Sequence, residues 1–182
     1  MKLLMPLALL GIALLSACAN PLNQVTSDNY AETCSTAKAN GRLEVAEQAC
    51  YRALVNVDWG NLGPELKSQR LYNLGRIKRQ LSKFSEAEQL FKESLSIEEK
   101  HSELSGIKVG RRLVELSVSL AGQDKWPEGV QFVERLLPIA DQFSGQERTY
   151  TAKVLTEYSK QLRSKNDIST AERFEAKALA LQ

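Results

Sequence analysis

A small residue recurs along the chain at a nearly constant interval, and this repeat limits the folds open to the chain. The residues are Ala46, Ala87, Gly129 and Ala171, which are separated by 41, 42 and 42 positions. Self-similarity at a fixed period of this length is the signature of an architecture in which one supersecondary unit is built several times. We therefore expect four stacked units.

Each unit contains two stretches with helical periodicity. A second small residue lies 12 positions before each of the first set, and apolar residues accompany both at three- and four-residue steps. This spacing predicts amphipathic helices, and Asn40-Gly41 and Asn166-Asp167 are typical of the turns between them. The second set is Cys34, Gly75, Ser117 and Ser159. The expected fold is all-α, with four helix-turn-helix units and no strands, over residues 27–57, 64–100, 103–142 and 144–182.

The small residues have a physical reason. Two helices that cross closely need side chains without bulk where their backbones approach. Neither helix of a unit can bury its apolar face alone, so the units must stack to form a core. Ser144 with Glu147 predicts a capping box at the start of a helix. Glu175 takes a position that is apolar in the earlier units, as expected of a last helix that no further unit covers.

The first residues of the chain have the pattern of an export signal. Lys2 precedes an apolar run from Leu3 to Leu15, which small residues and Cys18 follow. One positive charge and about 13 apolar residues are typical of a secretory signal, whereas a membrane-spanning helix needs about 20. The alternative is a buried helix of a cytoplasmic protein.

The segment Leu15-Ser16-Ala17-Cys18 resembles the lipobox of bacterial lipoproteins. The resemblance implies cleavage before Cys18 and attachment of acyl chains, palmitate among them, to that cysteine. Since Ala19 follows rather than aspartate, it also implies an outer-membrane location that faces the periplasm. The expected organisation is a signal peptide over residues 1–17, the lipidated cysteine with a short tether over 18–26, and the repeat domain over 27–182.

The second unit resembles the tetratricopeptide repeat (TPR). Its Leu74-Gly75, Phe84, Ala87, Phe91 and Ser94 fall at the spacing of that family, and the likeness extends over 27–182. Units of 41 to 42 residues are similar to the long repeats of kinesin light chains. The resemblance implies a right-handed α-solenoid whose concave face, built from the first helix of each unit, binds a peptide or protein.

Cys34 and Cys50 remain once Cys18 is assigned to the lipid. Their spacing of 16 is too wide for a CxxC redox motif. Both positions face the interior of the first helical hairpin, so a disulfide forms if their Cα atoms lie within about 7 Å. The alternative is two buried free thiols.

Several kinds of function are disfavoured. A net charge of +2 gives no reason to expect nucleic acid as a partner. The one histidine, His101, lies in a charged stretch, and Gly60-Asn61-Leu62-Gly63 lacks the lysine of a phosphate-binding loop. We therefore expect no catalytic residues, no metal site, no cofactor and no enzyme activity.

The predicted concave face is rich in basic residues and amides, which favours an acidic or carboxylate-ended peptide as ligand. Asn73 matches the family position whose amide contacts a bound peptide backbone. The alternative is a solvated face that binds nothing. The residues projected onto this face are Tyr72, Asn73, Arg76, Arg79, Arg111, Val114, Glu115, Val118, Lys153, Thr156, Glu157, Lys160 and Arg163.

These features together predict a lipid-anchored scaffold that binds another cell-envelope protein. The machinery served is a pilus, secretion, export or cell-wall apparatus. The alternative is a chaperone-like module that holds exported polypeptide in the concave groove. The sequence does not predict the oligomeric state.

Overall fold

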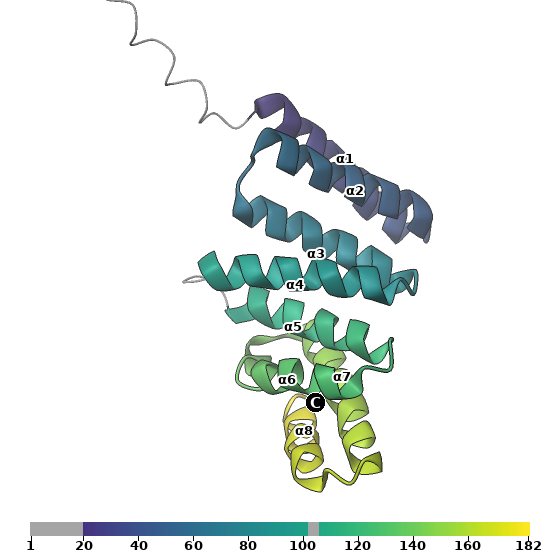
Figure 1. The fold of residues 1–182 in the computed structure, drawn as a ribbon, viewed down its shortest axis with the longest axis vertical. Coiled ribbons are helices and arrows are strands. Elements are labelled where there is room, and N and C mark those ends of the chain that lie inside the picture. Colours follow the sequence, from purple (N-terminus) through teal and green to yellow (C-terminus); the bar gives the residue numbers. More distant parts are fainter. Residues whose placement is uncertain (1–19, 102–105) are drawn as a thin grey trace, which may run out of the picture.

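The computed structural model describes residues 20–101 and 106–182, and these residues contain eight α-helices and no strand. Figure 1 shows them as consecutive antiparallel pairs stacked along the long axis of the molecule. The expected fold class, an all-α solenoid of four helix-turn-helix units, is confirmed. The helices are α1 (Pro21–Ala39), α2 (Leu43–Gly60), α3 (Pro64–Gln80), α4 (Phe84–His101), α5 (Gly106–Ala121), α6 (Trp126–Leu136), α7 (Gly145–Ser164) and α8 (Ile168–Ala180), with a short 3₁₀ helix, η1 (Ala140–Gln142).

The predicted signal peptide and Cys18 lie outside the described residues, but the predicted tether is too long. Helix α1 begins at Pro21, so residues 21–26 are helical rather than extended. Asn20 caps the helix, because its side-chain oxygen accepts a hydrogen bond from the Leu22 amide at 3.1 Å. Pro21 suits the first helical position, where no backbone N–H is needed.

The repeated small residues lie where helices cross closely, as the pattern predicts. Ala46, Ala87 and Ala171 are fully buried. A methyl group added to Gly75 would lie 2.7 Å from a ring carbon of Phe91. At this crossing a large side chain packs against a residue that has none, which is how a helical core reaches close packing.

The first hairpin is also held by a covalent bond. Cys34 on α1 and Cys50 on α2 are joined by a disulfide, with their Cα atoms 5.2 Å apart. A bond that closes a loop of this length stabilises a fold by about 3 kcal/mol, chiefly by restricting the unfolded chain.

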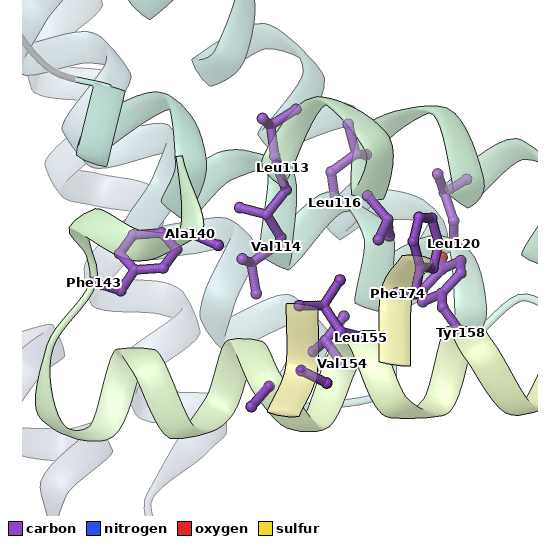
Figure 2. Packing of buried hydrophobic residues seen from close by; sticks show 14 of the residues in the cluster. Leu113, Val114, Leu116, Leu120, Ala140, Phe143, Val154, Leu155, Tyr158 and Phe174 are labelled. Atoms are coloured by element: carbon purple, nitrogen blue, oxygen red, sulfur yellow. The ribbon is translucent and has the colours of Figure 1, made fainter. Parts of the chain in front are cut away.

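The fourth helical pair is turned relative to the first three. Figure 1 shows α8 running along the long axis, whereas α1 to α6 lie across it. The change follows α6, which ends after 11 residues because Pro138 cannot continue a helix. In Figure 2, Leu113, Leu116 and Leu120 of α5 lie above Val154, Leu155 and Tyr158 of α7. The Tyr158 hydroxyl donates to the Ser117 carbonyl at 2.7 Å, and its ring meets the edge of Trp126.

The predicted capping box at the start of α7 is wrong. Ser144 is the N-cap residue, but its side chain makes no capping hydrogen bond. The carboxylate of Glu147 instead accepts two hydrogen bonds from Arg111 on α5, at 2.6 and 3.0 Å. An ion pair between units has replaced a local contact.

Five of the ion pairs between neighbouring units share one sequence separation, 36 residues, whereas several others are 37 to 43 residues apart. The five pairs are Glu47–Lys83, Arg79–Glu115, Glu99–Arg135, Arg111–Glu147 and Asp141–Lys177.

A buried polar cluster joins the second and third units, and we call Ser68, Ser94, Glu98 and Arg112 the inter-unit cluster. Ser68 donates to Glu98 at 2.7 Å, and Arg112 lies 2.9 Å from the same carboxylate. Arg112 also donates to Ser94 at 3.0 Å. All four residues are buried, so each polar group depends on the others for its hydrogen bonds.

The Glu88 carboxyl makes the stability of the folded protein depend on pH in the acid range. Burial by itself raises the pKa of Glu88, but hydrogen bonds from Lys92, Gln123 and Lys125 outweigh it and lower the pKa from 4.5 to about 2. A carboxyl whose pKa is lower in the folded state stabilises the fold above its unfolded pKa and loses this effect as pH falls. The contribution is about 3 kcal/mol at neutral pH, of which about 2 kcal/mol is lost by about pH 3.

We therefore expect the free energy of unfolding of Glu88→Gln to fall less at acid pH than that of wild type. Urea unfolding at about pH 7 and about pH 3 should show wild type losing about 2 kcal/mol more than this variant between the two. The exposed Glu44 at the start of α2 provides a control, since Glu44→Gln should follow wild type. Parallel profiles for Glu88→Gln and wild type would contradict the assignment.

Candidate partner-binding groove

A groove runs along the first helices of the units. It consists of three adjoining hollows of about 300, 540 and 120 Å³, and each of four residues lines two of them: Tyr72, Asn73, Arg76 and Arg111. The hollow of about 540 Å³ lies between α1, α3 and α5. The first one, of about 300 Å³, lies between α3, α5 and the start of α7. We call the first the basic hollow. Its lining includes Tyr72, Arg76, Arg79, Arg111, Glu115, Glu147 and Tyr150.

Arginines dominate the polar groups of the basic hollow. The Arg79 Nε donates to the buried carboxylate of Glu115 at 2.5 Å, and the Arg76 Nε lies 3.4 Å from the same carboxylate. Arg111 pairs with Glu147, and both of these side chains are well exposed. Three guanidinium groups thus face two carboxylates, which leaves an excess of positive charge.

Two tyrosine rings support these arginines. Arg76 and Arg112 lie over the Tyr72 ring, at 5.7 and 4.7 Å from its centroid, and Arg79 lies 5.9 Å from that of Tyr150. Stacking on a ring face restricts a guanidinium group and favours its charge. Burial raises the pKa of Tyr72 to about 12, and the nearby Glu115 carboxylate adds to the rise, so the hydroxyl stays a neutral hydrogen-bond donor.

Two buried polar atoms in this hollow lack hydrogen-bond partners. Within residues 20–101 and 106–182, they are the Arg76 Nε and the Tyr150 hydroxyl. A buried donor without a partner costs about 1–3 kcal/mol. Both atoms could donate to an oxygen atom of a ligand.

The excess positive charge also acts on a neighbouring lysine. Lys38 of α1 lines the smallest of the three hollows together with Arg76. Burial lowers the pKa of Lys38, and the charges of Arg76 and Arg79 lower it further, although Glu115 opposes them. The groove is therefore electrostatically suited to an anionic group.

The structure gathers some of the predicted concave residues and separates others. Tyr72, Arg76, Arg79, Arg111 and Glu115 line the basic hollow, and Asn73 lies in the two adjoining ones. The predicted residues of the fourth unit lie elsewhere, because only the first two turns of α7 line the basic hollow and these residues come later on the helix. Lys153 lines a separate hollow with Thr149, Lys160 pairs with Glu157, and Arg163 pairs with Glu175.

Sequence reasoning did not identify Tyr150, Glu147 or Lys38 as groove residues. Helix α7 enters the groove with its first two turns, so a 42-residue projection from Arg111 selects Lys153 instead. One signal was present in the sequence. Arg79 and Glu115 are 36 residues apart, as are Arg111 and Glu147, and this interval identifies Glu147.

The described residues contain no group of three or more histidine, cysteine, aspartate or glutamate side chains placed to hold a metal ion. None of their helices combines the length and apolar character that crossing a bilayer requires.

The stacked helical pairs, with small residues at the crossings and a groove along the first helices, define a TPR-like helical-repeat solenoid. Solved structures share this fold. One is a structure of nearly identical TPR-like repeats of a kinesin light chain from Podosopora anserina. Its sequence is 16% identical to this chain, the alignment covers 86% of this chain and 74% of that one, and the TM-score is 0.65. Another, BtubC (BKLC) from P. vanneervenii, is 18% identical over 87% of this chain and 64% of its own, with a TM-score of 0.74.

No protein-family model and no curated protein sequence matches the chain. At these low identities, the structural similarity establishes the fold alone.

Proposed function

We propose that this protein is a lipid-anchored scaffold of the cell envelope that binds the carboxylate-bearing end of a partner polypeptide in the groove. The observation that carries the proposal is a pair of buried polar atoms that make no hydrogen bond in the basic hollow: the Arg76 Nε, which lies 3.4 Å from the Glu115 carboxylate, and the Tyr150 hydroxyl. A carboxylate could accept a hydrogen bond from either atom and would offset the excess positive charge. Arginine is well suited to this role because its planar group matches a carboxylate.

The ion pairs around the hollow suit reversible binding. Glu115 is buried and holds Arg79, so this pair is a fixed part of the wall. Arg111 and Glu147 are each about 40% exposed, and an exposed pair contributes about 1 kcal/mol or less. An incoming carboxylate can therefore replace Glu147 on Arg111 at little cost.

Two features support an exported, anchored protein. The segment from Lys2 to Cys18 has the pattern of a lipoprotein signal. The disulfide between Cys34 and Cys50 is typical of proteins that fold in an oxidising compartment such as the periplasm. We place the protein at the outer membrane, facing the periplasm, where a pilus, secretion, export or cell-wall apparatus would supply the partner.

The test uses paired peptide libraries with either a free or an amidated C-terminus. Wild type should retain the free-acid set and lose it on amidation. The double variant Arg76→Ala, Arg111→Ala should bind at least about 100-fold more weakly, since each of the two lost hydrogen bonds to a charged group contributes about 1.5–3 kcal/mol. Helicity should not change.

The control is Lys160→Ala, Arg163→Ala, which removes two positive charges from α7 outside the basic hollow. It should bind as wild type does. An equal loss of peptide binding in both double variants would show that net charge alone causes the loss. Unchanged binding by Arg76→Ala, Arg111→Ala would show that the peptide binds elsewhere. A chaperone-like module would instead retain many sequences whether or not they were amidated.

A further inference from the structure

Large apolar side chains are exposed at the end of the molecule where the described chain begins. Leu22, Val25 and Trp59 are 70, 57 and 76% exposed. Helix α2 packs its opposite side into the core, so Trp59 points away from the stack although it is the kind of side chain that proteins usually bury in large part. We call these three residues the N-terminal apolar patch.

The patch brings together two segments that are distant in sequence. The Asn20 amide donates to the Gly60 carbonyl at 3.3 Å, which fixes the start of α1 against the end of α2. Leu22 is two residues from this contact, and Trp59 is one residue from it. Figure 1 shows the start of α1 beside the end of α2 at one end of the long axis.

The lipid-bearing residue of the proposed anchor is close to this patch. Cys18 precedes Asn20 by two residues, so the chain between them spans at most about 7 Å. Acyl chains on Cys18 would therefore hold the patch at the bilayer surface. The nearby Asp58 is paired at 3.1 Å with Lys67, which also pairs with Glu93 at 3.1 Å, so the negative charge of Asp58 is offset in part beside Trp59.

We infer that the N-terminal apolar patch is a membrane contact in which Trp59 enters the headgroup region of the bilayer. The inference rests on the proposed lipid anchor. A tryptophan ring combines an apolar body with a polar N–H, and such rings prefer the boundary between hydrocarbon and water. Because the patch provides a second attachment beside the acyl chains, it sets the orientation of the solenoid, which a flexible lipid tether alone does not.

The test measures tryptophan fluorescence of the mature protein, produced in bacterial cells from the full chain, in vesicles of phosphatidylethanolamine and phosphatidylglycerol. Some vesicles carry a nitroxide-labelled lipid with its label about 5–10 Å below the headgroups, the depth that interfacial side chains reach. The chain has two tryptophans, so wild type is compared with Trp59→Phe, in which only Trp126 emits. We expect the nitroxide to quench a substantial part of the wild-type emission and almost none of the Trp59→Phe emission.

The matched control moves the reporter along the same helix. Tyr51 of α2 is also exposed, and the double variant Tyr51→Trp, Trp59→Phe places tryptophan eight residues away, about 12 Å along the helix. Its emission should escape quenching. Vesicle flotation distinguishes the two proposals: protein that floats without quenching at Trp59 overturns the membrane contact alone, whereas protein that does not float overturns the anchor as well.

Discussion

Replacing Gly129 by alanine is expected to lower the free energy of unfolding by about 3–5 kcal/mol. The added Cβ would lie 1.8 Å from the Tyr158 hydroxyl oxygen and 2.6 Å from the ring carbon that bears it. The tyrosine would have to move, and it would lose its hydrogen bond to Ser117 and its edge contact with Trp126. Urea unfolding followed by circular dichroism measures the loss.

Two further variants make this prediction specific. Gly106→Ala should change stability by less than about 1 kcal/mol, because the added methyl meets only the flexible end of Gln142, 3.1 Å away. Adding Tyr158→Phe to Gly129→Ala removes the closest atom but leaves the ring, so it should recover only part of the loss. Gly129→Ala as stable as wild type would show that this helix crossing is looser than described.

The second large effect is expected at the inter-unit cluster. Arg112→Met removes the cation but leaves the Glu98 carboxylate buried, together with the hydroxyl groups of Ser68 and Ser94. Removing one partner of a buried ion pair costs about 3–5 kcal/mol, because the remaining charge has no compensation. Thermal and urea unfolding should both show the loss.

A double variant separates the pair from the packing around it. Glu98→Leu with Arg112→Met should be more stable than Arg112→Met alone, since no buried charge remains. The adjacent residue is the control: Arg111 forms an exposed pair with Glu147, so Arg111→Met should change stability by less than about 1 kcal/mol. Equal losses at the two arginines would contradict a special role for the cluster.

The repeat predicted the architecture because its small residues report directly on packing. Ala46, Ala87 and Ala171 lie at helix crossings as expected. Gly129 stands where the other units have alanine, and the structure provides the reason: Tyr158 of the turned α7 occupies the space that a methyl group would need. A period alone carries no information about which later side chain fills that space.

The groove was predicted in part for a related reason. Tyr72, Arg76 and Arg111 lie on helices that keep the regular stacking, so the 42-residue register places them together. Lys153 lies after Pro138 and the shortened α6, where the direction of the helices changes. Ion pairs between units also depend on which side chains meet across a crossing, and this is a tertiary property that helical periodicity does not encode.

The disulfide between Cys34 and Cys50 has a mechanical consequence for the lipid-anchored scaffold that we propose. Tension on a partner bound in the groove would reach the membrane through the first hairpin, and α1 would be the first helix to be pulled away. The covalent link ties the last third of α1 to the middle of α2, so the hairpin cannot be peeled apart beyond that point. Under reducing conditions the same load would separate the two helices, and the force needed to extend the molecule would fall.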